Sequence, residues 1–439
     1  MKFPSIKGFD EEAFNKYLKN TGWLMFGKML SLVVNLAIAK YLGPTSFGDL
    51  SFAIALVAIT GAIGALGLDT FIIREIIHNP SQKEEILGTS LWLRLGTNAL
   101  LIPITILVYL VNHYFSSQPG TTLTSLVALL AFTSLFKSFN VIDAYFQSQV
   151  QSKHVVHVQN ICLIISALIK IGILLLKLPL LYIVLALFFD ALILAIGLII
   201  VYQSKAGNIF RWKFNKKRAI SLLNQSYPLI LSAVMVSIYM KIDIVMLKTV
   251  GSKAVGIYAA AANISEAWYF IPVAIVTSVF PALINARKTD LERYHKRLKN
   301  LYDLLVYISL PVAIFISFFA NDITNLIYAD KFDGAGIMLS IHIWSGIFVF
   351  LGSASSQYLI AEGYIKISFY RTALGAIVNV LLNLWLIPLY AGIGASIATL
   401  IACFVSAFLI LFIPKTRPQG IMMLKSLFLV SLFQKLVKR

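Results

Sequence analysis

Apolar runs of about 20 residues recur along the whole sequence, and only short polar breaks separate them. A helix of this length crosses roughly 30 Å of hydrocarbon, so each run predicts a membrane-spanning helix. The composition agrees, because 59% of the residues are hydrophobic, 13% are charged and the mean hydropathy is +0.83. The 439 residues therefore predict an all-α polytopic membrane protein with no room for a large soluble domain.

The apolar runs predict about twelve transmembrane helices. The first run contains Lys28 and lacks a small-residue cleavage site, which favours a retained helix over a cleaved signal peptide. The stretch Ile421–Val437 is interrupted by polar residues and predicts an amphipathic helix at the membrane surface. The twelve expected helices are 22–42, 50–75, 87–112, 122–148, 155–177, 180–203, 219–248, 253–284, 299–320, 335–361, 366–390 and 392–413.

Lysine and arginine concentrate on alternate connections between these helices. The opposite connections carry four of them, Lys177, Lys248, Lys253 and Lys331. Because positive loops stay in the cytoplasm, both termini are expected to be cytoplasmic. The net charge of +18 follows from this bias and from attraction to anionic lipid head groups, and we expect no nucleic-acid partner.

The second half of the sequence repeats the first at an offset of 208 residues. The segment "NLAIAKYLGPTSFGDLSFA" from Asn35 aligns with "DIVMLKTVGSKAVGIYAAA" from Asp243, so that Gly48 falls on Gly256. Two six-helix lobes with the same membrane orientation are expected, with a central cleft suited to alternating access. The predicted parts are a cytoplasmic segment 1–21, a first lobe 22–203, a basic linker 204–218, a second lobe 219–413 and a basic tail 414–439.

Six cations lie inside the predicted helices and away from their ends. At about 2.5 to 3.5 kcal/mol for each lipid-facing charge, six would cost about 15 to 20 kcal/mol, so they should face a cavity or pair with acids. Intramembrane acids are fewer, which indicates that some cations bind an anionic ligand. The predicted substrate-binding cations are Lys28, Arg94, Lys137, Lys170, Lys241 and Arg371. The predicted coupling-ion ligands or counter-charges are Asp143, Asp190, Asp243 and Glu266.

Polar stripes follow helical spacing beside some of these charges. Ser31 and Asn35 share a helix face with Lys28, Asn140 lies near the face of Lys137, and Asn379 and Asn383 are one turn apart. We expect these side chains to line the cavity, although such stripes also join neighbouring helices by hydrogen bonds. Lys241 and Asp243 are about 200° apart around their helix, so they are expected to face different partners.

The sequence contains no phosphate-binding glycine loop, catalytic triad or nucleotide motif, which favours a transporter without direct ATP drive over an enzyme. A membrane glycosyltransferase or ligase is disfavoured because no large outer loop is present. A multidrug cation antiporter remains an alternative, although it would favour intramembrane acids over cations. We expect no cofactor or metal, and H⁺ or Na⁺ as the coupling ion. Cys162 and Cys403 lie in apolar runs and predict packing residues.

The segments "NTGWLMFGKMLSLVVNLAIAKYLGPTSFGDLSFAIAL", "GLDTFIIREI" and "KIDIVMLKTVGSKAVGIYAAAANISEAWYFIPVAIVTSVFPAL" resemble the Wzx-type polysaccharide (O-antigen) flippases. These belong to the multidrug, oligosaccharidyl-lipid and polysaccharide exporter superfamily. The resemblance implies a V-shaped cavity between two lobes and ion-coupled antiport. It also implies movement of an undecaprenyl-pyrophosphate-linked oligosaccharide to the outer leaflet of a bacterial inner membrane, with a polysaccharide polymerase complex as a partner. Lipid II flippases typically have fourteen helices, so the twelve expected helices favour the polysaccharide flippases. By position, the implied cavity cations are Lys28, Arg94, Lys137, Lys170 and Lys241.

Overall fold

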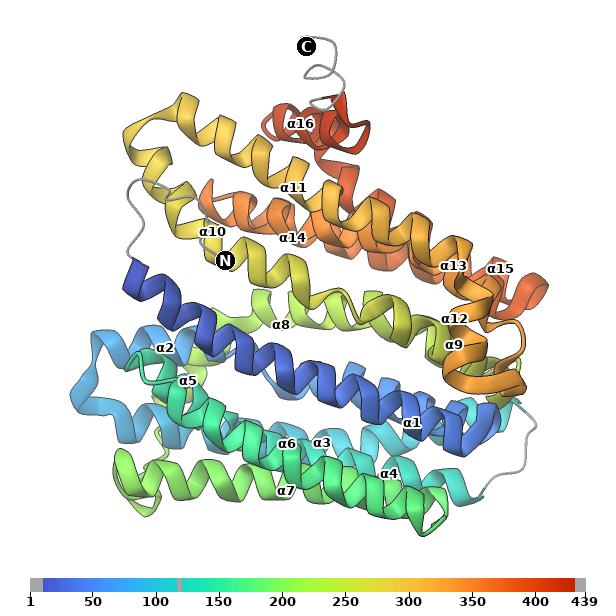
Figure 1. The fold of residues 1–439 in the computed structure, drawn as a ribbon. Coiled ribbons are helices and arrows are strands. Elements are labelled where there is room, and N and C mark those ends of the chain that lie inside the picture. Colours follow the sequence, from blue (N-terminus) through green and yellow to red (C-terminus); the bar gives the residue numbers. More distant parts are fainter. Residues whose placement is uncertain (1–10, 117–120, 431–439) are drawn as a thin grey trace. The chain divides into compact units, whose positions relative to one another are not determined.

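The computed structural model describes residues 11–116 and 121–430, and these are helical, with no β-strand among them (Figure 1). The α-helices are α1 (Glu11–Gly64), α2 (Asp69–His78), α3 (Lys83–Ser116), α4 (Thr121–Lys137), α5 (Val141–Ser148), α6 (Lys153–Leu175), α7 (Leu180–Lys205), α8 (Lys216–Leu247), α9 (Ser252–Glu266), α10 (Phe270–Thr289), α11 (Leu291–Phe318), α12 (Ala320–Tyr328), α13 (Ala335–His342), α14 (Ser345–Ala361), α15 (Ile365–Phe408) and α16 (Arg417–Leu427). The 3₁₀ helices are η1 (Pro80–Gln82), η2 (Ser138–Asn140), η3 (Ile209–Arg211), η4 (Ala329–Phe332) and η5 (Leu409–Phe412).

Within the described residues, ten helical segments are long and apolar enough to cross a membrane. Two of them, Gly27–His78 with 52 residues and Ile365–Phe412 with 48, are each long enough for two crossings. Between the two crossings that each segment contains, the backbone leaves the helical region, at Gly43 (φ 70°) in the first segment and at Ala391 (φ 47°) in the second. The ten segments therefore contain the twelve predicted helices, and the all-α polytopic fold is confirmed. The V-shaped cavity stays a prediction.

Four predicted helices contain an interruption that the sequence did not predict. They are the second and fourth helices of each half, and the breaks replace regular helix by short turns, as in the bond from Tyr269 N to Glu266 O of 3.0 Å. An ionisable residue flanks every break: Asp69, Lys137, Glu266 and His342. The interrupted positions are 65–68, 138–140, 267–269 and 343–344.

The chain divides into two compact units that only partly follow the predicted lobes. Unit 1 comprises the described residues of Met1–Ile38, Gly64–Leu107 and Ser125–Leu229. Unit 2 comprises those of Ala39–Ile63, Val108–Thr124 and Ile230–Arg439. Residues 39–63 and 108–124, predicted in the first lobe, thus group with the second repeat because they pack against it.

Inside unit 2, the aligned glycines of the two repeats make one contact twice. A Cβ added to Gly48 would lie 1.8 Å from Ser252 O, and a Cβ added to Gly256 would lie 1.8 Å from Pro44 O. At the offset of 208, Pro44 aligns with Ser252 and Gly48 aligns with Gly256, so the two contacts are equivalent. Only glycine permits such a close approach of two backbones. The repeat predicted from sequence is therefore present in the packing.

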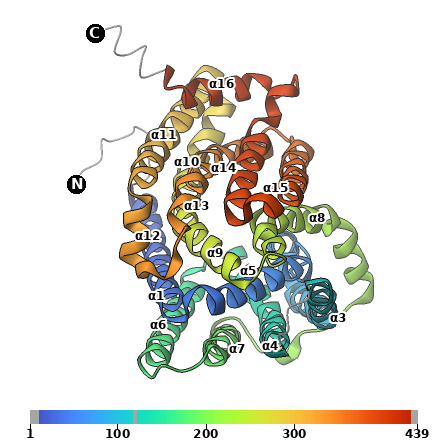
Figure 2. The same ribbon diagram turned by 90° about the vertical axis from the view of Figure 1, so that its right-hand side faces the viewer.

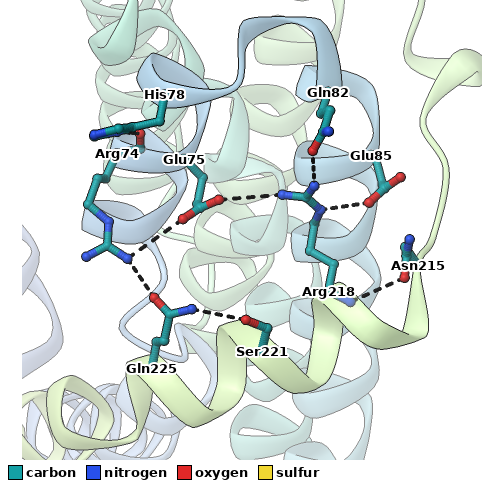
Figure 3. Close-up of polar contacts among 9 residues, drawn as sticks. All are labelled: Arg74, Glu75, His78, Gln82, Glu85, Asn215, Arg218, Ser221 and Gln225. Carbon is teal, nitrogen blue, oxygen red and sulfur yellow. Dashed lines mark hydrogen bonds and ion pairs between the residues drawn. The ribbon is translucent and has the colours of Figure 1, made fainter.

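The predicted basic linker is packed against unit 1 through Arg218 (Figure 3). Arg218 Nε donates to Glu85 Oε1 at 2.7 Å, Nη1 lies 3.6 Å from Glu75 Oε2, and Nη2 bonds Gln82. Asn215 begins α8, since its Oδ1 accepts from the backbone N of Arg218 at 3.2 Å. Charge-assisted bonds to two acids fix the start of α8 on α2 and α3.

Unit 2 is built around α9, α13, α14 and α15, which pack on one another and on α11 (Figure 1, Figure 2). The helix α16 packs on α11, where Ser426 Oγ donates to Asp303 Oδ1 at 2.6 Å and Gln419 bonds Tyr302. With 11 residues α16 is too short to span. Residues 431–437 of the predicted surface helix lie outside the described residues.

Gly256→Ala should destabilise the protein, because its Cβ meets the backbone at Pro44. Overpacking costs about 1–3 kcal/mol, so we expect the melting temperature in lipid nanodiscs to fall by roughly 2–12 °C. Gly96→Ala is the matched control, since nothing lies within 4 Å of its added Cβ. Equal melting temperatures for the two variants would show that the close approach is absent in the membrane.

Candidate functional site

Asp243 is the centre of a buried polar site in unit 2, with 3% of its surface exposed. Asn383 Nδ2 donates to Oδ1 at 2.7 Å, Tyr258 OH donates to Oδ2 at 2.8 Å, and Thr399 Oγ1 lies 2.6 Å from Oδ2. These donors come from α9 and from both halves of α15. They are all neutral, so the carboxylate has hydrogen bonds but no counter-charge from them.

Two asparagines extend this site along α15. Asn383 Nδ2 bonds Asn379 Oδ1, and both residues are fully buried. Asn383 Oδ1 and Asn379 Nδ2 form no hydrogen bond with any described residue. Thr399 Oγ1 also lies 3.0 Å from the backbone oxygen of Ala395. The site thus gathers carboxylate, amide, hydroxyl and backbone oxygens, which are the ligands that a hard cation prefers.

Lys241 and Asp243 have different partners, as their helical spacing predicts. Lys241 Nζ lies 2.9 Å from Glu266 Oε2, and the exposed fractions of these two side chains are 28% and 21%. Glu266 is the last residue of α9, at the interruption before α10. This half-buried ion pair lies in the same unit as the Asp243 site. The lysine and the glutamate neutralise each other, so the pair carries no net charge.

Two predicted cations of unit 1 are also paired with acids. Arg94 Nη2 lies 2.8 Å from Asp69 Oδ1; the arginine side chain is 3% exposed and the aspartate 58%. Lys170 Nζ lies 2.6 Å from Asp190 Oδ2, and Ser166 bonds to both. These pairs join α2 to α3 and α6 to α7. Because each cation already has a counter-charge, neither needs a substrate anion for its stability. Their role in substrate binding stays a prediction.

Lys137 differs from the other intramembrane cations. It is the last residue of α4, it is exposed, and it forms no hydrogen bond or ion pair with any residue that the structure describes. Asn140, in the η2 turn that follows, is exposed too, and Asp143 is half-buried near Gln147. Lysine at a helix C-terminus is favoured by the helix dipole, but that does not neutralise its charge.

The remaining predicted residues lie in two different settings. Lys28, Ser31 and Asn35 are exposed along one face of α1. Arg371 is buried inside unit 2, where Nη2 donates to Ser356 Oγ at 2.6 Å and to Gly352 O at 3.2 Å. Its Nε and Nη1 find no acceptor in the part of the chain that the structure describes. Arg371 therefore points into the helix packing of unit 2 and keeps unused hydrogen-bond donors.

Sequence reasoning missed Tyr258, Thr399 and His342. Thr399 has a signal, because Ser396, Thr399 and Cys403 share one helix face within an apolar span. His342 has another, since it is an ionisable residue inside a predicted membrane helix. Tyr258 has none, because a tyrosine in an alanine-rich helix is equally suited to packing.

The fold and its intramembrane charges define a polytopic α-helical membrane protein with the architecture of a transporter. The family profile described as polysaccharide biosynthesis protein matches residues 17–287, and a MatE profile matches residues 228–385. Because the first match covers more than half of the chain, this chain belongs to the polysaccharide biosynthesis protein family.

Curated relatives are similar over part of their length. An uncharacterized membrane protein, MJ1375, from Methanocaldococcus jannaschii is 27% identical over 233 residues, which cover 49% of this chain and 52% of the relative. The probable flippase AglR from Haloferax volcanii is 27% identical over 157 residues, 35% of this chain and 33% of the relative. The matches thus span about half and about a third of these proteins.

Solved structures share the fold at low sequence identity. The lipid II flippase MurJ in an inward closed conformation has a TM-score of 0.73 at 15% identity, over 95% of this chain and 93% of that one. An inward-facing MATE multidrug resistance transporter of the MOP superfamily has a TM-score of 0.71 at 14% identity, over 91% and 96%. The TM-scores establish a common fold with both structures.

Breaking the Lys241–Glu266 pair should destabilise the protein more than removing both charges. We expect Lys241→Met and Glu266→Gln each to lower the free energy of unfolding. The double-mutant cycle should give an interaction energy of about 1–3 kcal/mol between the two side chains. Thermal unfolding of the four proteins in nanodiscs measures these free energies. Lys253→Met, which removes an exposed lysine of unit 2, is the control and should change little. Additive single effects would exclude an ion pair in the lipid-embedded protein.

Proposed function

We propose that this protein is a flippase that moves an undecaprenyl-pyrophosphate-linked oligosaccharide from the cytoplasmic to the outer leaflet of a bacterial inner membrane by alternating access. Membership of the polysaccharide biosynthesis protein family supports a role in glycan export. Similarity to a protein named a probable flippase, and a fold shared with a lipid II flippase, support a lipid-linked substrate.

Lys137 is the observation that carries this proposal. Each of the four interrupted helices carries an ionisable residue at its break; Asp69 and Glu266 have ion-pair partners and His342 a hydrogen-bond partner, whereas Lys137 has none among the described residues. An unpaired lysine inside a membrane helix is costly unless it faces water or an anion. In the proposal, the pyrophosphate supplies that anion. The exposed amide of Asn140 offers hydrogen bonds to the oligosaccharide.

Arg94 supplies a second contact in the proposal. Its partner Asp69 is largely exposed, and Arg94 Nε is buried without a hydrogen bond to any residue in the described ranges. A pyrophosphate with several negative oxygens competes well for a guanidinium held by one exposed carboxylate. Asn98, one helical turn from Arg94, donates to Ser138 Oγ at 3.0 Å, and Ser138 follows Lys137 directly, so the proposal lets one anionic head group meet both cations.

The Asp243 site is proposed to bind the coupling cation. Its carboxylate lacks a counter-charge among its hydrogen-bond partners. Asn383 Oδ1 is a buried acceptor that receives no hydrogen bond from the described residues. A buried, unsatisfied acceptor beside a carboxylate is satisfied by a bound cation. Na⁺ accepts such neutral oxygen ligands, and H⁺ can occupy the carboxylate alone. Antiport of either ion would drive the substrate outward.

A multidrug cation antiporter is the second candidate. The MatE profile covers residues 228–385, which include Asp243 and Glu266, and the MATE fold is shared. A cationic drug would need an acid that is free to bind it. Glu266 is held by Lys241, and Asp243 is buried, so neither offers an exposed carboxylate.

Lipid binding by purified protein in nanodiscs tests the flippase proposal. We expect Lys137→Gln to weaken binding of undecaprenyl-pyrophosphate-linked oligosaccharide by roughly tenfold, equivalent to about 1.4 kcal/mol, because one cation contact is lost. Lys205→Gln, at an exposed lysine of α7, should bind like the wild type. Excess ethidium should leave lipid binding intact. Ethidium binding without lipid binding would replace the flippase by the multidrug antiporter.

The cation site is tested separately through stability. Sodium chloride should raise the melting temperature of the wild type relative to N-methylglucamine chloride at equal ionic strength, since a ligand of the folded state stabilises it. Asp243→Asn should abolish most of that difference. Asp322→Asn removes an exposed acid of α12 and should retain it. A sodium effect that survives in Asp243→Asn would place the cation elsewhere.

A further inference from the structure

Arg371 is a buried cation to which the described residues give no counter-charge. It lies near the start of α15 and is 5% exposed. The helices α14 and α15 pack against each other (Figure 2), and neither contains an aspartate or a glutamate. An arginine side chain stays charged in a folded protein. In the described part of unit 2, the cations that form ion pairs are Lys241, Lys248, Arg287 and Lys299.

Two acids on the elements around α14 are held by other partners. The helix α11 packs on α14 and carries Asp303, whose Oδ1 accepts from Ser426 Oγ at 2.6 Å. Glu362 directly follows α14, and its Oε1 lies 2.8 Å from Arg287 Nε. An uncompensated charge inside a membrane protein is costly. The positive charge of Arg371 therefore calls for a negative charge from outside the described residues.

The guanidinium of Arg371 has donors that the helix packing does not use. Nη2 donates to Ser356 Oγ at 2.6 Å and to Gly352 O at 3.2 Å, both on α14. The buried Nη1 finds no acceptor among the residues that the structure describes. A guanidinium can only donate hydrogen bonds, so the ligand that completes it is an acceptor. A negatively charged acceptor satisfies the donor and the charge together.

Small residues of α14 lie beside this guanidinium. A Cβ added to Gly352 would lie 3.9 Å from both Nη1 and Nη2, so the guanidinium faces a position that has no side chain. Ser355, three residues further along the same helix face, is fully buried, and its Oγ forms no hydrogen bond with any described residue. Ser353 shows the usual alternative, since its Oγ donates to Val349 O at 2.9 Å. A second unused donor is thus buried on the helix face that Arg371 contacts.

The ligand that fits this position is small and has a single negative charge. With 5% of its surface exposed, Arg371 cannot meet a head group that carries hydrocarbon chains unless α14 and α15 separate. One negative charge balances the guanidinium, whereas two would leave a buried negative charge in excess. A pyrophosphate is excluded on both grounds. Chloride, bromide and nitrate have the required size and charge.

We propose that Arg371, Gly352 and Ser355 form a binding site for a small monovalent inorganic anion such as chloride. The anion accepts hydrogen bonds from Arg371 Nη1 and Ser355 Oγ, lies beside the Cα of Gly352 and stabilises the packing of α14 on α15. It stays bound to the folded protein and is not transported. Arg371 thereby has a ligand other than the substrate anion predicted from sequence. The proposal depends neither on the cation at Asp243 nor on the lipid-linked substrate.

Thermal unfolding in nanodiscs tests the anion site. Sodium chloride is compared with sodium gluconate at equal sodium concentration, so that the occupancy of a sodium site is the same in both. We expect the melting temperature of the wild type to rise with chloride concentration, because a ligand of the folded state stabilises it. Sodium bromide should act like chloride. Arg371→Gln should lose the rise, and Arg293→Gln, which removes an exposed arginine of α11, should keep it.

A second variant keeps the test decisive if Arg371→Gln does not fold. Ser355→Ala retains the guanidinium and removes one donor, so it should weaken the chloride affinity about tenfold. In crystals grown with sodium bromide, anomalous scattering should place a bromide beside Arg371 Nη1. No chloride effect in the wild type, or an effect unchanged in both variants, would overturn the proposal. Equal stabilisation by inorganic pyrophosphate that Arg371→Gln abolishes would return Arg371 to the substrate. None of these outcomes alters the expected effect of Lys137→Gln on lipid binding.

Discussion

Hydrocarbon cannot solvate a charge, so each ionisable side chain inside the membrane helices depends on the partner that the fold gives it. In unit 1, Arg94 and Lys170 are neutralised by aspartates, and in unit 2 Lys241 is neutralised by Glu266. Asp243 has neutral donors instead. Among the described residues, Lys137 and Asp243 form no ion pair, and the proposed function assigns the substrate anion to the first and the coupling ion to the second.

The sequence predicted the architecture well because its signals are local. A run of apolar residues long enough to cross the membrane needs no tertiary information, and the repeat at an offset of 208 is visible in the letters alone. The interruptions at 138–140 and 343–344 were not predictable, because serine, phenylalanine, asparagine, isoleucine and tryptophan occur there and all tolerate a helix. The grouping of 39–63 with unit 2 also follows from packing between segments far apart in the chain.

The candidate site was predictable only as far as helical geometry reaches. The opposite facing of Lys241 and Asp243 follows from a 100° step per residue, and the structure gives them separate partners. The identity of those partners depends on which helices pack together. Thr399 is 156 residues from Asp243 in sequence, and Tyr258 reaches it from another helix. Lys137 could be recognised as an intramembrane cation from sequence, whereas its lack of a partner could not.

The glycine contact in unit 2 ties the two halves of the chain to each other. Gly48 lies on the backbone at Ser252, and Gly256 lies on the backbone at Pro44, so each half of the chain imposes the same residue on the other. A side chain at either position would have to displace the backbone of the opposite half, so a change in one half is accommodated only if the other half also moves. The two halves of unit 2 are therefore tied to a common spacing at this contact.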